Sequence, residues 1–192
     1  MSMIKHAPWV GADFNPGPPR LLVLGEGHHS SYADDEGLTN PVIEMWLSGS
    51  QHLKFFTHIA VALTGQEPNE IDRRAVFKNI AFYNFVTTVM PNARVKPSWS
   101  DFLASYPAFH EVLDLLKPTH MIVFGIRLWD AMPSFPDGLP DGEPVNLYDD
   151  QFNIGRYTYD GGSTLAMRAR HPAAGFNGRE WFPRIQSFLT MD

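Results

Sequence analysis

The chain has 192 residues, of which 44% are apolar and 13% aromatic, with no cysteine and a formal charge of −6. This size and apolar content exclude wholesale disorder and predict one domain over residues 1–192. The lack of cysteine excludes disulfide scaffolds, thiolate zinc sites, cysteine-held iron–sulfur clusters and a cysteine nucleophile.

Short apolar runs without clean alternation predict strands that are covered on both faces. These runs are residues 21–24, 80–86, 121–124 and 164–167. Between them, apolar residues at helical spacing predict one helix over about residues 53–63. They predict a second helix that has Ser100 as its N-cap and ends at residue 116. Residues 133–160, rich in proline, glycine and acids, are interpreted as a long surface excursion before the last strand.

Alternating strands and helices over this length predict an α/β fold, namely a three-layer α/β/α sandwich with a central four-stranded parallel sheet. In such folds ligands bind at the carboxyl ends of the strands. The functional residues are therefore expected immediately after the four apolar runs.

The acidic residues are unevenly distributed. Seven of them against one base fall between Asp130 and Asp160, so the rest of the chain has no net charge. Arg168 and Arg170 lie in a mildly basic C-terminal part, which leaves room for a basic face toward nucleic acid. No apolar run is long enough for a signal peptide or a membrane span, so we expect a cytoplasmic protein with no membrane partner.

Three polar features follow the predicted strands. Gly25-Glu26-Gly27-His28-His29 follows the first strand, Asn84 lies within the second, and His171-Pro172 follows the fourth. Each has an ordinary structural interpretation: a tight turn with solvated histidines, an amide bonded to backbone, and a surface turn. The alternative is a ligand site, in which the carboxamide reads a planar molecule that offers one donor and one acceptor.

Other chemistries have weaker support. Glu26, His28, His29 and His171 lack the spacing of known metal motifs, so we expect no metal and no other cofactor. No Gly-x-Ser-x-Gly motif of a serine hydrolase is present.

Taken in order, these features resemble the uracil-DNA glycosylase superfamily, over roughly residues 20–176. The resemblance lies in the glycine-led first loop, the strand asparagine, the segment from Lys117-Pro118 to Gly125, and the His-Pro pair, with Trp99 and Asp101-Phe102 similar to a Trp-Glu-x-Phe stretch. The chain departs from it at Gly27, where one branch has its water-activating aspartate, and at Ala173, where the family has serine.

The resemblance implies hydrolysis of the N-glycosidic bond of uracil or a related damaged base in DNA by a monomer. His171 would donate to the departing base and Glu26 would position water. Substrate contacts would come from Gly25, Gly27, His28 and Asn84, with Trp46 or Tyr32 stacking on the base. Arg168 and Arg170 would hold phosphate, and Phe176 would act as an apolar wedge in the minor groove.

Two alternatives stay open. One is a base-binding member of the same fold without catalysis, and the other is an α/β hydrolase of a nucleoside or another small molecule. His6 lies outside every motif, so we expect His6→Ala to have no effect.

Overall fold

The structure is a computed structural model that describes residues 2–14, 17–30, 37–133, 144–147, 150–173 and 175–191. Its helices are α1 (Thr39–Leu47), α2 (Lys54–Thr64), α3 (Arg73–Phe77), α4 (Trp99–Leu116), α5 (Ile126–Ala131) and α6 (Gly178–Phe188). Its strands are β1 (Trp9–Val10), β2 (Leu21–His29), β3 (Ile80–Met90), β4 (His120–Phe124), β5 (Pro144–Leu147), β6 (Asp150–Tyr159) and β7 (Gly162–Ala169).

The described strands form one mixed sheet in the order β1-β3-β2-β4-β7-β6-β5. Strands β3, β2, β4 and β7 pair in parallel, while β1 is antiparallel to β3 and β6 is antiparallel to β7. The α/β class is thus confirmed, but the sheet is mixed and larger than a four-stranded parallel sheet. The four predicted runs lie in β2, β3, β4 and β7.

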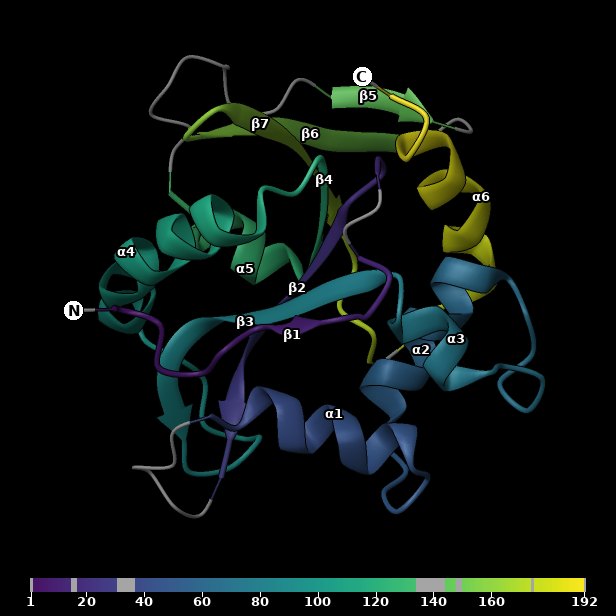
Figure 1. The fold of residues 1–192 in the computed structure, drawn as a ribbon, viewed down its shortest axis with the longest axis horizontal. Coiled ribbons are helices and arrows are strands. Elements are labelled where there is room, and N and C mark those ends of the chain that lie inside the picture. The colour runs from purple at the N-terminus through teal and green to yellow at the C-terminus, as the bar shows by residue number, and fades with distance from the viewer. Residues whose placement is uncertain are drawn as a thin grey trace.

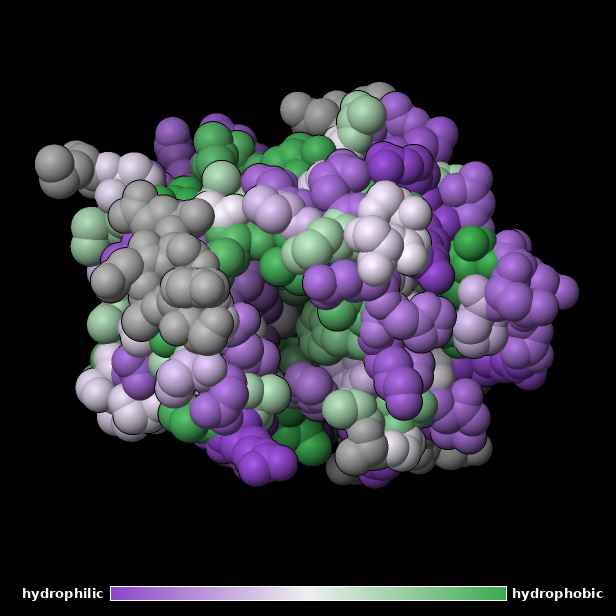
Figure 2. All heavy atoms as spheres, turned by 90° about the horizontal axis from the view of Figure 1, so that it is seen from below, coloured by the Kyte–Doolittle hydropathy of each residue, from purple (hydrophilic) through white to green (hydrophobic). Residues whose placement is uncertain are grey.

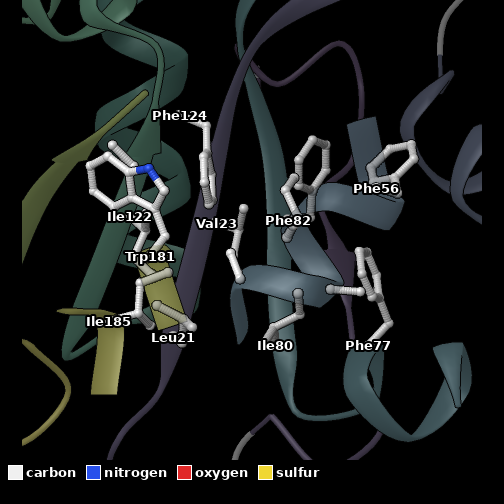
Figure 3. Close-up of a cluster of buried hydrophobic side chains, with 14 of the residues drawn as sticks. Leu21, Val23, Phe56, Phe77, Ile80, Phe82, Ile122, Phe124, Trp181 and Ile185 are labelled. Atoms are coloured by element: carbon white, nitrogen blue, oxygen red, sulfur yellow. The ribbon is translucent and has the colours of Figure 1, made fainter. Parts of the chain in front are cut away.

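Helices cover both faces of the sheet. Helices α2, α3 and α6 lie on one side, and α4 and α5 lie on the other (Figure 1). The first face carries alternate strand residues such as Val23, Phe82 and Phe124, which pack with Phe56 and Ile185 (Figure 3). The remaining strand residues, such as Leu24 and Val123, pack against α4 and α5. Burial on both faces explains why these strands have continuous apolar sequences.

The segment 133–160 is not only a surface excursion. Its residues 144–147 and 150–159 form β5 and β6, which extend the sheet beyond β7. Residues 134–143 and 148–149 lie outside the described residues. A polar antiparallel strand near a sheet edge lacks the apolar run by which the central strands were found.

The first predicted loop is also a strand. Strand β2 runs through Gly25, Glu26 and Gly27 to His29 and stays paired with β3. The pairing is irregular between Gly27 and His29, as at a β-bulge. The functional residues of this segment therefore lie on a strand, whose pairing fixes their positions.

The N-cap of helix α4 is Ser98, not Ser100. The Ser98 hydroxyl accepts a hydrogen bond from the Asp101 N–H, and the Asp101 carboxylate accepts one from the Ser98 N–H. This reciprocal arrangement is a capping box, which satisfies backbone N–H groups that the first helical turn leaves free.

We expect Ser98→Ala to lower the free energy of unfolding by about 1 kcal/mol, because the cap of α4 is lost. Ser100→Ala is the matched control, since Ser100 caps nothing and its hydroxyl contacts only that of Ser98. Urea denaturation of both variants measures the difference. Equal losses would contradict the assignment of Ser98 as the cap.

Candidate functional site

A cavity of about 540 Å³ lies at the carboxyl ends of β2 and β3. Glu26, His28, Asn84 and His171, which come from distant parts of the sequence, all line it. Figure 2 views the molecule from the lower end of Figure 1, toward which β2 and β3 point, and shows a hollow near the middle of that face. The predicted strand-end residues thus share one cavity, of a size typical for small-molecule sites.

Asn84 continues a buried face of β3. Ile80 and Phe82 lie on this face in the core, and the next residue with the same orientation is Asn84, which is 9% exposed. Its partner in the sheet register is Gly25. A Cβ at Gly25 would lie 2.4 Å from Asn84 Oδ1, so the amide occupies space that only glycine leaves open.

His28 orients the Asn84 amide. Asn84 Nδ2 lies 3.2 Å from His28 Nδ1, and His28 Nε2 lies 3.1 Å from the Thr39 hydroxyl. Burial lowers the pKa of His28 to about 3, and nearby His6 and His29 lower it too, so the ring is neutral at pH 7. Asn84 Nδ2 lies within 3.3 Å of both ring nitrogens, and a neutral ring protonated on Nε2 can donate to Thr39 while it accepts from Asn84 at Nδ1. This pattern directs the nitrogen of the amide toward His28 and leaves Oδ1 without a hydrogen bond from the described residues.

His6 supports His28 and is not a peripheral residue. Its ring packs edge-on against His28 with centroids 4.6 Å apart. The Leu38 N–H donates to His6 Nδ1, so Nε2 carries the proton and donates to the Thr87 carbonyl at 3.2 Å. The expectation that His6→Ala has no effect is therefore wrong, since the substitution removes a buried contact of the site.

Glu26 is held by Arg127 of α5. Arg127 Nε donates to Glu26 Oε2 at 2.9 Å, and Arg127 Nη2 donates to Oε1. The pair is bidentate and only partly exposed, which fixes the direction of the carboxylate. Sequence reasoning did not identify Arg127 as a site residue, because nothing in the sequence links it to Glu26.

His171 lies at the rim of the cavity and keeps contact with solvent. Partial burial lowers its pKa, as do Arg127 and His29, whereas Glu26 acts in the opposite direction. No hydrogen bond from the described residues engages the ring. His58 Nδ1 of α2 donates to the Pro172 carbonyl at 2.7 Å and so fastens the turn that carries His171.

The aromatic wall of the cavity is formed by Phe55 and Phe82. The ring of Phe55 lies 5.5 Å from that of His171. The predicted aromatic, Trp46, is 1% exposed and packs in the core against Phe56 and Phe77, so its assignment was wrong. Tyr32 lies outside the described residues.

The predicted nucleic-acid contacts fall outside the cavity. Arg170 is exposed at the end of β7, and Arg168 is half-buried on that strand. Phe176 is stacked 6.0 Å from Trp181 and also contacts Phe124 and His58. A ring packed in this way does not project as a wedge, so that prediction was wrong.

A second hollow, of about 620 Å³, lies at the opposite ends of the strands, beside Leu21 and Ile80. Its three acids already have structural partners: Asp13 pairs with Lys78, Asp72 caps α3, and the Glu70 carboxylate accepts from the Glu67 N–H. It contains no histidine among its described residues. The smaller cavity therefore carries the more reactive set of side chains.

Within the described ranges, no three histidine, aspartate or glutamate side chains gather as a metal site. None of the helices in those ranges is both long and apolar enough to cross a membrane. No protein-family model and no curated protein matches the chain.

We expect Gly25→Ala to displace the Asn84 amide and to destabilise the fold by about 1–3 kcal/mol, because the new methyl overlaps Oδ1. Gly27→Ala is the control, since its nearest neighbour, Val86 Cβ, would lie 3.5 Å away. Side-chain amide NMR signals and thermal unfolding measure both effects. Equal behaviour of the two variants would contradict the close approach at Gly25.

His28 should make the fold sensitive to acid. Its pKa is about 3 when folded and about 6.5 when unfolded, so the unfolded chain binds the proton more readily. The contribution of the neutral His28 ring to the free energy of unfolding is complete above pH 6.5. It falls by at most about 1.4 kcal/mol per pH unit as the pH is lowered toward 3.

Urea denaturation from pH 4 to 8 tests this, with His28→Gln expected to flatten the acid side of the stability curve. The control is His52→Gln, at an exposed position, which should leave the slope unchanged. A slope that His28→Gln does not alter would refute a neutral buried His28.

Proposed function

We propose that the protein is a DNA base glycosylase that hydrolyses the N-glycosidic bond of uracil or a related damaged base. The observation that carries the proposal is the convergence of Asn84, His171 and Glu26 on one cavity at the strand ends. The resemblance of the motifs to the uracil-DNA glycosylase superfamily adds to it. The proposal includes DNA as partner, a monomeric state and a cytoplasmic location.

Recognition of the base is assigned to Asn84. One amide hydrogen is engaged by His28, which leaves the other hydrogen and Oδ1 for a ligand. Uracil presents a carbonyl beside a ring N–H, which matches this pair of acceptor and donor. Cytosine presents an amino group beside an unprotonated nitrogen, so both contacts would fail. A buried polar group left unpaired in this way discriminates strongly between similar ligands.

Phe55, which is partly exposed, supplies the apolar surface for the flat face of the base, whereas Phe82 is 1% exposed and belongs to the core. Aromatic rings favour offset stacking on such a surface. Phe55 takes the role that the sequence analysis gave to Trp46 or Tyr32. Its closeness to His171 supports stacking and hydrogen-bond donation at the same ligand.

His171 stabilises the leaving base. As the bond to the sugar breaks, negative charge develops on the base carbonyl, and a positioned N–H that faces this oxygen lowers the barrier. The lowered pKa keeps the ring neutral at pH 7. A neutral ring can donate a hydrogen bond to the base without competing with Arg127 for an ion pair with Glu26. The hydrogen bond from His58 to Pro172 holds the turn of His171 in place.

Glu26 positions water and faces the positive charge that forms on the sugar. Arg127 uses part of the hydrogen-bonding capacity of both carboxylate oxygens, and the remaining lone pairs can accept from a water molecule. An oxocarbenium-like sugar reacts with neutral water, so orientation matters more than strong basicity.

The Glu26–Arg127 pair also favours a second candidate, a base-binding protein of the same fold without cleavage. A carboxylate engaged by a guanidinium is less free to orient water than an unpaired one. This candidate predicts binding of uracil-containing DNA without abasic product. The third candidate is a nucleoside hydrolase, which predicts no DNA binding even at low salt. Low salt is the condition under which counterion release most favours binding to DNA.

We expect His171→Ala to lower uracil release by about 10²–10³-fold, the usual cost of losing one donor to a developing anion. Asn84→Ala should also reduce release sharply and should weaken discrimination against cytosine. Both variants should stay folded by circular dichroism. His110→Ala is the matched control for His171, because it removes a part-buried histidine of α4 that does not line the cavity.

The measurement is the formation of abasic sites in single-stranded and duplex DNA that contains uracil. Unchanged release in both the His171 and Asn84 variants would refute the proposed mechanism. Wild-type binding without any abasic product would support the non-cleaving alternative.

A further inference from the structure

A smaller hollow of about 430 Å³ adjoins the candidate cavity. It is lined by Pro97, Trp99, Phe102, Ile126 and Arg127, together with Asp130 and Ala131. Pro97 lines both hollows, and Arg127 of the smaller one is bonded to Glu26 of the larger one. The two hollows are therefore adjacent, with Pro97 and the Glu26–Arg127 pair between them.

Large apolar side chains are exposed in this hollow. Trp99, the first residue of α4, is 58% exposed, and Ile126, the first residue of α5, is 48% exposed. The capping box at Ser98 and Asp101 fixes the start of α4 without burying the indole. An indole held at a helix start beside other apolar groups offers a flat, accessible stacking surface.

The charges around the hollow suit a phosphate backbone on one side. Arg94 and Lys96 are exposed in the segment that leads to Pro97, and neither forms an ion pair within the described residues. Asp130 also lines the hollow. Its carboxylate would repel phosphate, but it can accept hydrogen bonds from the amino or imino group of a base.

We infer that this hollow binds the nucleobase next to the target base, stacked on Trp99, with the backbone along Arg94 and Lys96. This inference rests on the proposed function and assigns it a substrate, single-stranded DNA. In a duplex, a base could stack on the indole only after it had separated from the bases stacked above and below it. Proteins that bind single strands commonly hold them by such stacking on aromatic side chains. Phe176, packed against Trp181, offers no wedge to open a duplex.

The first test is binding of a uracil-free single-stranded oligothymidylate, measured by fluorescence anisotropy. We expect Trp99→Ala to raise Kd by about 5- to 150-fold, from the energy of one base–aromatic stack, and Trp99→Phe to restore most of the affinity. Leu103→Ala is the matched control, because Leu103 is 46% exposed one turn along α4 but does not line the hollow.

Three outcomes would overturn the inference: no binding by the wild-type protein, equal effects of Trp99→Ala and Leu103→Ala, or tighter binding to duplex than to single strand. The oligothymidylate contains no uracil, so this arm does not depend on cleavage. Binding through Trp99 without uracil release would sustain the stacking site while refuting the glycosylase proposal.

The second test is uracil release from a single-stranded oligonucleotide and from the same oligonucleotide with abasic positions on both sides of the uracil. Trp99→Ala should raise KM for the first substrate and leave kcat unchanged. It should have no effect on the second substrate, which has no neighbouring base to stack. Uracil release that Trp99→Ala does not alter would refute the stacking site and leave the proposed function standing.

Discussion

The site depends on the close contact between Gly25 and the side-chain amide of Asn84. Asn84 lies over Gly25, and its amide nitrogen is held by a histidine whose burial keeps it neutral. Protonation of both ring nitrogens of His28 would leave the ring no acceptor for the Asn84 amide nitrogen, which lies within 3.3 Å of each of them. The Thr39 hydroxyl and the edge-on ring of His6 also contact His28, so these three residues together fix one carboxamide. The rest of the cavity is arranged around that fixed group.

The central part of the fold could be predicted because its strands are buried on both faces. Continuous apolar runs mark β2, β3, β4 and β7, and the glycines and polar residues after them mark the edge of the sheet at which the candidate cavity lies. Strand β6 was missed since its polar sequence reflects a place near the end of the sheet. The extension of β2 to His29 was missed because glycine and histidine are more common in turns, whereas here pairing with β3 decides the conformation.

The candidate site could be predicted where strand position alone determines a residue's location, as for Asn84 and His171. It could not be predicted where packing between distant elements decides. Trp46 of α1 and Phe55 of α2 both contribute to the same hydrophobic cluster, yet one is buried in the core and the other lines the cavity. Phe176 follows a His-Pro turn like a protruding loop residue, but Trp181, a few residues later, covers it. The Glu26–Arg127 pair joins β2 to α5 and has no signature in either segment.

Helix α2 has a double role at the cavity. Its residue Phe55 forms the aromatic wall, and its residue His58, one turn later, fastens the turn of His171. Asn84 and Glu26, in contrast, belong to strands of the sheet. Phe55 and the turn of His171 are both attached to α2, so a displacement of this helix would carry the two rings together and preserve the spacing between them.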